Sequence, residues 1–355
     1  MRNKSPTSAH LNAVVVVVMG VGLLGCKLER REALDIDGVG QADTSNPISV
    51  AVPGAAVDLE LKPNEPAVVA FGPASGLVVD VSPAVGAALD RIRSGASASH
   101  AATSAARVLE NVVCSATTRI GVTSQAPPDA AVMDATGKFG AVALSEDLRD
   151  PLGAALLVSK TPFVTLVGKR AAQFAELGGA SPLPTVVPAA PAAPSHAADG
   201  GADEGAASIP GAPTAPAPIA PDTTAEALDH ANTWYGVIVR ATPEDFAVAL
   251  STRCMARMPT GSLGAVPIPG AAMFVGPEGA AVAVGSVDYV IRTQASRKVY
   301  GVIAQDTPPN VAVEQVMAGT PRASGIGFLV IGQNMMRIQS LRKLSWAAYP
   351  SPQMH

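Results

Sequence analysis

Residues that could carry out hydrolytic chemistry are scattered along this chain, and no motif fixes their roles. His100, His230 and His355 could each act as a general base, but they stand far apart. A serine, histidine and carboxylate triad stays open, because triads assemble from distant positions. Neither a GxSxG string nor a P-loop string is present. The side chains therefore name no reaction.

Two further chemistries have little support in the sequence. Ser340 to Lys343 match an SxxK spacing, which resembles the nucleophile motif of penicillin-binding proteins, but the SxN and KTG motifs are missing. The chain also lacks HExxH and paired cysteines, which are the usual ligand patterns of zinc. We therefore predict no catalytic residue, no metal site and no cofactor.

The N-terminal segment has the three-part layout of an export signal. Two basic residues precede an apolar run over residues 13–24, and the segment ends Leu-Leu-Gly-Cys at Cys26. The run is too short for the roughly 20 residues that span a bilayer. The ending resembles the lipobox of bacterial lipoproteins, which are cut before a cysteine that carries a diacylglycerol. The resemblance implies a signal peptide over residues 1–25 and a membrane anchor at Cys26. It also implies a location in the cell envelope, on the periplasmic face of the outer membrane in a Gram-negative cell.

Two cysteines remain after this signal, and two states are open for them. Cys114 and Cys254 could form a disulfide, since such bonds persist outside the cytoplasm. A bond between them would close a loop of about 140 residues and would stabilise the fold by about 5 kcal/mol on the chain-entropy model. They could equally be two buried thiols that act as small apolar groups.

Composition indicates how the chain is divided. Only 15% of the residues are charged and the net charge is −4, which excludes a generally basic nucleic-acid binder. Proline and alanine concentrate in residues 181–221, which we predict to be a disordered linker. The other predicted parts are a charged tether over residues 26–47, an N-terminal domain over 48–180 and a C-terminal domain over 222–355.

Short valine-rich runs and helix-start signals alternate in both predicted domains, which favours an α+β fold. In the N-terminal domain the expected strands cover residues 48–52, 57–61, 68–71, 77–81, 117–122, 130–134, 138–144 and 162–167, and the expected helices cover 83–93, 100–113 and 168–177. In the C-terminal domain strands are expected over residues 263–268, 271–275, 280–284, 287–293, 325–331 and 335–341.

An internal repeat is the most informative pattern in the C-terminal domain. Residues 235–248 read YGVIVRATPEDFAV and residues 300–313 read YGVIAQDTPPNVAV, with eight of 14 positions identical. Each copy has an apolar run, then Thr-Pro, which suits a helix N-cap and its first position. The pattern predicts two β-α-β-β-like units side by side. Chance similarity is the alternative, because valine and Thr-Pro helix starts are common.

No known family is recognised for the two predicted domains. These observations favour a lipid-anchored envelope protein without catalytic activity, a structural or interaction module. Its expected partner is an envelope protein or polymer, which would bind through residues 222–355. The alternative is a periplasmic hydrolase-like enzyme or a ligand receptor with a cleft between the two domains. A histidine beside a serine and a carboxylate in that cleft would favour the enzyme.

Overall fold

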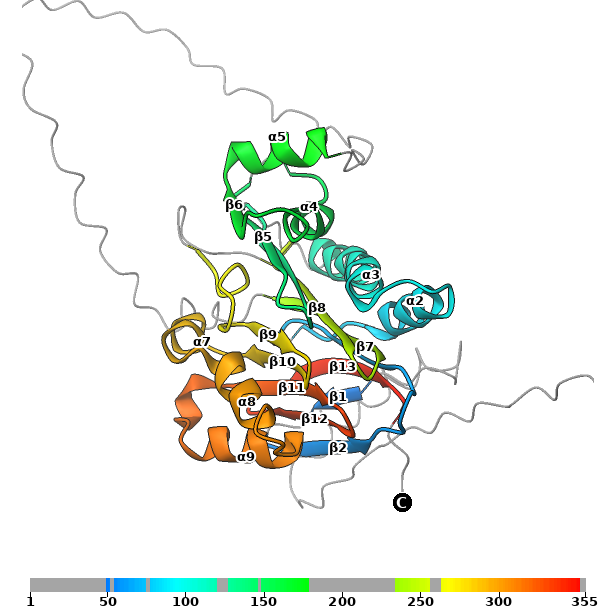
Figure 1. Ribbon diagram of the computed structural model, residues 1–355. Coiled ribbons are helices and arrows are strands. Elements are labelled where there is room, and N and C mark those ends of the chain that lie inside the picture. Colours follow the sequence, from blue (N-terminus) through cyan, green and yellow to red (C-terminus); the bar gives the residue numbers. More distant parts are fainter. Residues whose placement is uncertain are drawn as a thin grey trace, which may run out of the picture.

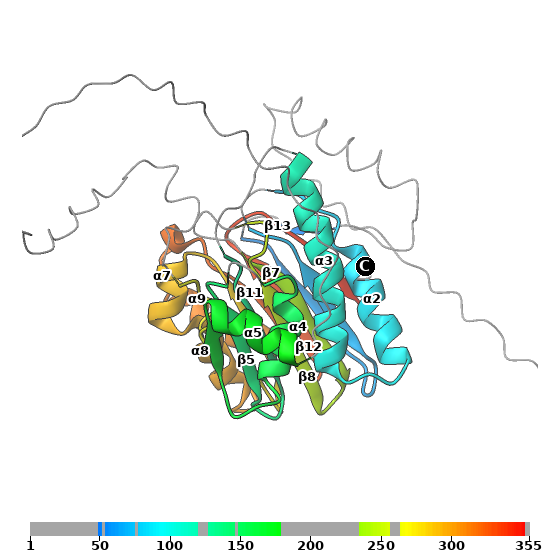
Figure 2. The same ribbon diagram turned by 90° about the horizontal axis from the view of Figure 1, so that it is seen from above.

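The computed structural model is built from two β-sheets that lie face to face between two layers of helices (Figures 1 and 2). It describes residues 49–51, 54–74, 77–119, 127–145, 148–178, 234–255 and 263–351. The signal peptide, the tether and the linker therefore lie outside the described residues. No helix among the described residues is long and apolar enough to cross a membrane.

Sheet A holds eight of the described strands, and β7 and β8 lie in its middle. Its strands, in spatial order, are β1 (Ser49–Ala51), β13 (Leu344–Tyr349), β3 (Ala67–Phe71), β7 (Tyr235–Thr242), β8 (Asp245–Ser251), β4 (Ala130–Asp134), β5 (Phe139–Ala143) and β6 (Thr165–Val167). Neighbouring strands are antiparallel except β5 and β6, which are parallel.

Sheet B holds five described strands, all antiparallel to their neighbours. In spatial order they are β2 (Ala56–Glu60), β12 (Met335–Ser340), β11 (Gly327–Gly332), β10 (Gly279–Val284) and β9 (Met273–Gly276).

Helices cover the outer face of each sheet. Those packed on sheet A are α2 (Ser82–Arg93), α3 (Ala98–Arg119), α4 (Pro151–Val158) and α5 (Lys169–Leu177), and those on sheet B are α7 (Val287–Thr293), α8 (Ala295–Ile303) and α9 (Pro309–Ala318). A short 3-10 helix, η2 (Arg322–Ser324), leads into β11. The order of layers is helix, sheet, sheet, helix (Figure 1), and Figure 2 shows α2 and α3 on the opposite side of the strands from α7, α8 and α9.

The apolar runs of the sequence become strands that are buried on both faces. In β3, Val69 and Phe71 face the core between the sheets, whereas Val68 and Ala70 face the core under α2 and α3. Successive side chains of a strand point to opposite faces, so a strand between two cores must be apolar throughout. This packing explains the low charge content of the chain.

The α+β class is confirmed, but the two expected domains are not separate bodies. Strands β1, β2 and β3 of the N-terminal part pair with β13, β12 and β7 of the C-terminal part. Both sheets are therefore shared between residues 48–180 and 222–355. The reason is that strands apolar on both faces need partners on both edges, and the other half of the chain supplies them.

The two copies of the expected repeat adopt different structures. Residues 235–248 form β7, a turn and most of β8, which is a hairpin with Thr242 opposite Asp245. Residues 300–313 end α8 and begin α9. The expected pair of β-α-β-β units is absent from the described residues, because the first Thr-Pro lies in a hairpin turn and only the second precedes a helix.

Other expected strands also differ from the structure. Residues 287–293 form α7, which carries an ion pair between Asp288 and Arg292 at helical spacing. Residues 117–119 continue α3, and residues 77–81 and 263–268 form no strand. Strand β13 was not expected at all.

Candidate active site

A polar cluster lies at one end of the sandwich, where β7 begins and β8 ends. Trp234, Thr252 and Asp129 extend three neighbouring strands by one residue each, as the pairing of Tyr235 and Ala130 with Ser251 shows. We call this place the Trp234 end. Trp234 is buried, and its indole Nε1 donates to the carbonyl oxygen of Ala283 in sheet B, 3.1 Å away.

Asp129 and Thr252 hold each other at this end. The backbone N–H of Asp129 donates to Thr252 Oγ1 at 2.8 Å, and the N–H of Thr252 donates to the Asp129 carbonyl at 3.0 Å. The Asp129 carboxylate accepts from the N–H of Leu144 and of Gly264, one on each oxygen. One carboxylate thus joins the loops that follow β5 and precede β9.

Burial raises the pKa of Asp129 to about 6, although its two N–H donors act to lower it. A carboxyl group with such a pKa exchanges protons near neutral pH. It is therefore suited to acid–base work at this end of the sandwich.

A second network fixes the residues after β8 from the helix side. Arg253 Nη1 lies 2.7 Å from Glu110 Oε1, and Ser251 Oγ donates to the other oxygen of Glu110. The Tyr235 hydroxyl donates to the Arg253 carbonyl. Burial raises the pKa of Glu110, while Arg253 acts to lower it. These contacts join α3 to the first residues beyond β8.

A disulfide joins the same two segments. Cys114 of α3 and Cys254 are bonded, with Cα atoms 5.2 Å apart and a separation of 140 positions in the chain. The bond lies next to Arg253 in sequence, so it fixes the segment that carries Thr252 to α3.

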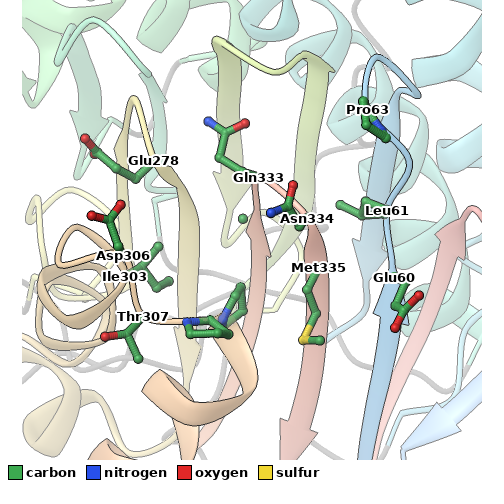
Figure 3. A pocket seen from close by; sticks show the side chains of 13 residues that line it. Glu60, Leu61, Pro63, Glu278, Ile303, Asp306, Thr307, Gln333, Asn334 and Met335 are labelled. Carbon is green, nitrogen blue, oxygen red and sulfur yellow. The ribbon is translucent and has the colours of Figure 1, made fainter.

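The described pocket lies at the other end of the sandwich (Figure 3). It is a groove of about 540 Å³ beside the turn between β11 and β12, with carboxylates on both walls. Strand β10 begins near this groove and ends near Trp234, so the two sites are separated by the length of the sheet.

The histidine hypothesis finds no support in the described residues. His100 is exposed at the start of α3, with Nδ1 2.9 Å from Ser97 Oγ and Nε2 3.3 Å from Lys160 Nζ. Burial first, then the charges of Lys160 and Arg91, lower its pKa. Its charged neighbours are thus cations, whereas a triad needs a carboxylate. His230 and His355 lie outside the described residues.

Ser340 supports the turn that follows β12. It is buried at the end of β12, and its Oγ accepts from the N–H of Arg342. No group of three or more possible metal ligands occurs among the described residues. Cys26 lies outside them, so its lipidation, the envelope location and a partner on residues 222–355 stay predictions.

Sequence reasoning missed Asp129, Thr252 and Glu110. Asp129 follows two prolines and precedes an apolar run, which is ordinary for a strand start. Its partner Thr252 is 123 residues away, and only the pairing of β4 with β8 brings them together. The one available signal was the Ser-Thr-Arg-Cys string, in which polar residues directly follow a buried strand.

Comparison with known proteins finds a match to one family model. A family model described as asparaginase matches residues 73–340, which contain Asp129, Trp234 and Thr252. No curated protein matches the chain. The expectation that the domains have no recognisable family was wrong. The interpretation as a module without catalytic activity was also wrong, because the matched family is one of hydrolases, and the match gives no support to a lipoprotein role.

Proposed function

Because the chain belongs to the asparaginase family, we propose that it is an amide hydrolase with an N-terminal nucleophile. The match over residues 73–340 is the observation that carries the proposal. The match favours the alternative that the sequence left open, a hydrolase-like enzyme. The proposed chemistry, with an N-terminal nucleophile, differs from that of a histidine-based triad.

Thr233 is the candidate nucleophile. It directly precedes Trp234 and the central strand β7 in the sequence, and it lies outside the described residues. A threonine of this type is activated by an α-amino group at a chain terminus, so it must be the first residue of its chain. The proposal therefore requires the peptide bond between Asn232 and Thr233 to be cut.

The reaction has two steps. The free amino group of Thr233 takes the proton of its hydroxyl, and the oxygen attacks the amide carbonyl of the substrate. The carbon–nitrogen bond breaks, ammonia leaves with the proton, and an ester on Thr233 remains. Water then attacks this ester, which releases the carboxylic acid and restores the hydroxyl.

The Trp234 end supports this proposal by its chemistry. Thr252 and Asp129 lie on the strands beside Trp234, and the hydroxyl of Thr252 is oriented by the Asp129 backbone. The carboxyl of Asp129 has a pKa of about 6 and can share a proton near neutral pH. The oriented hydroxyl of Thr252 is a group of the kind that stabilises the negative charge that develops on an attacked carbonyl.

Cleavage is the first test. Mass spectrometry of the purified protein should find a fragment that begins at Thr233, and Thr233→Ala should abolish that fragment. Thr223→Ala, in the same segment of the chain, is the matched control and should leave it unchanged. Ammonia release from asparagine, glutamine and simple carboxamides should fall by at least about 10³-fold in Thr233→Ala. An intact, inactive wild-type chain would contradict the proposal.

A further inference from the structure

The groove at the end opposite Trp234 is independent of the proposed hydrolase site. Four elements build it: the end of β2, the turn between β9 and β10, the connection between α8 and α9, and the turn between β11 and β12 (Figure 3). Its volume of about 540 Å³ is in the range of small-molecule sites.

The groove is preformed by contacts between its walls. Gln333 in the turn donates through Nε2 to the carbonyl oxygens of Pro243 and Pro277, at 2.7 and 2.8 Å. These two bonds join the β7–β8 turn of sheet A to the β9–β10 turn of sheet B. On the opposite wall, the N–H of Leu61 donates to the carbonyl of Asn334.

Negative charge lies on both walls of the groove. Figure 3 shows Glu278 and Asp306 on one side and Glu60 on the other. The described residues that line the groove include no lysine or arginine, and none of the three carboxylates forms an ion pair with a described basic side chain. Glu278 accepts from the Tyr300 hydroxyl, which fixes its position.

The surface between the carboxylates is largely apolar. Leu61, Ile303 and Met335 line it, and Leu61 and Ile303 are buried. Arg240 lies behind the wall at Leu61, where its Nη2 approaches the carbonyl of Lys62. Burial lowers the pKa of Arg240, and the nearby carboxylate of Glu65 acts to raise it.

We propose that this groove binds an aliphatic polyamine, with ammonium groups at the carboxylates of opposite walls and a methylene chain over Leu61, Ile303 and Met335. Separate carboxylates match the separate charges of a polyamine better than a single metal ion, which needs its ligands gathered around one point. The methylene chain gains from contact with the apolar floor.

Spermidine is the probe, and calorimetric titration of the full-length protein at low ionic strength is the measurement. We expect affinity to fall in the order spermidine, putrescine, butylamine, since each lost ammonium removes one ion pair. Glu60→Gln, Glu278→Gln and Asp306→Asn should each weaken spermidine binding about fivefold, and the triple variant should abolish it. Raising the salt to about 0.5 M should also weaken binding.

A second triple variant, Asp90→Asn, Glu176→Gln and Asp288→Asn, is the matched control, because it removes the same charge from exposed positions elsewhere. It should bind spermidine as the wild type does. The proposal would be overturned if both triple variants lost spermidine affinity to the same extent, or if the wild type did not bind spermidine. A lysine-rich peptide that binds more tightly than spermidine would overturn the choice of ligand. None of these outcomes depends on cleavage at Thr233.

Discussion

Single residues at the Trp234 end combine burial with charge. Asp129 and Glu110 are both carboxylates held within the fold by N–H or guanidinium donors. Such groups are costly to bury and are retained where they hold a structure or share a proton. Asp129 holds the loops that follow β5 and precede β9, whereas Glu110 supports the end of β8 from the side of α3.

The pKa of Asp129 predicts a pH dependence of stability. The folded pKa of about 6 lies above the usual value of 3.8, so the unfolded chain loses this proton first as the pH rises. The group therefore stabilises the fold fully below about pH 4, and this contribution of about 3 kcal/mol is lost as the pH rises through 6.

Urea unfolding of the wild type and of Asp129→Asn between pH 4 and 7 measures this effect. The difference between their free energies of unfolding should shrink as the pH rises, because asparagine does not titrate. Parallel curves would show that Asp129 keeps an ordinary pKa.

Arg253 should contribute far more to stability than an exposed arginine does. Arg253→Ala leaves the Glu110 carboxylate buried without its cation, and we expect a loss of about 3 kcal/mol. Arg93→Ala removes an exposed pair with Asp90 and should cost less than about 0.5 kcal/mol. Chemical denaturation of both variants gives the comparison, and equal losses would contradict the assigned role of the buried pair.

At the scale of elements, the same four residues, Tyr-Gly-Val-Ile, form a strand in β7 and the end of helix α8. In β7, Gly236 is closely covered: an added Cβ would lie 2.3 Å from the carbonyl oxygen of Ala249 on β8. In α8, a Cβ on Gly301 would meet no atom within 4 Å. Neighbouring elements, and not the local string, decide the structure here.

This contrast predicts opposite effects of one substitution. Gly236→Ala should destabilise the protein by about 1–3 kcal/mol, since backbone must move to admit the methyl group. Gly301→Ala should stabilise it by about 0.5–1 kcal/mol, because alanine is the better helix former. Thermal unfolding of the two variants tests both signs, and a shift in the same direction would refute the explanation.

Local patterns predicted many of the elements but not their arrangement. The apolar runs at β3 and β10 and the helix starts at α2 and α9 carry their signals within a few residues. Strand β7 was also expected, but the hairpin that follows it was read as a helix. The polar cluster could not be predicted, because Asp129 meets Thr252 only through the pairing of β4 with β8, and the two residues are 123 positions apart in the chain.

At the scale of the whole molecule, both halves of the chain contribute to both sheets. Residues before the predicted linker supply β2 and β3, and residues after it supply their partners β12 and β7. A cut at Thr233 would therefore leave two polypeptides that share one core. We expect them to stay together after cleavage, because separation would expose that core to water.

The bond between Cys114 and Cys254 takes on a different role once the chain is cut. One cysteine precedes Thr233 and the other follows it, so the bond would become the covalent link between two polypeptides. Cleaved protein should migrate as one species on a denaturing gel without reductant and as two with it. In Cys114→Ser it should separate in both gels. In the cleaved form, the bond would stabilise the assembly by raising the effective concentration of each fragment around the other, so that refolding from denaturant would not depend on protein concentration.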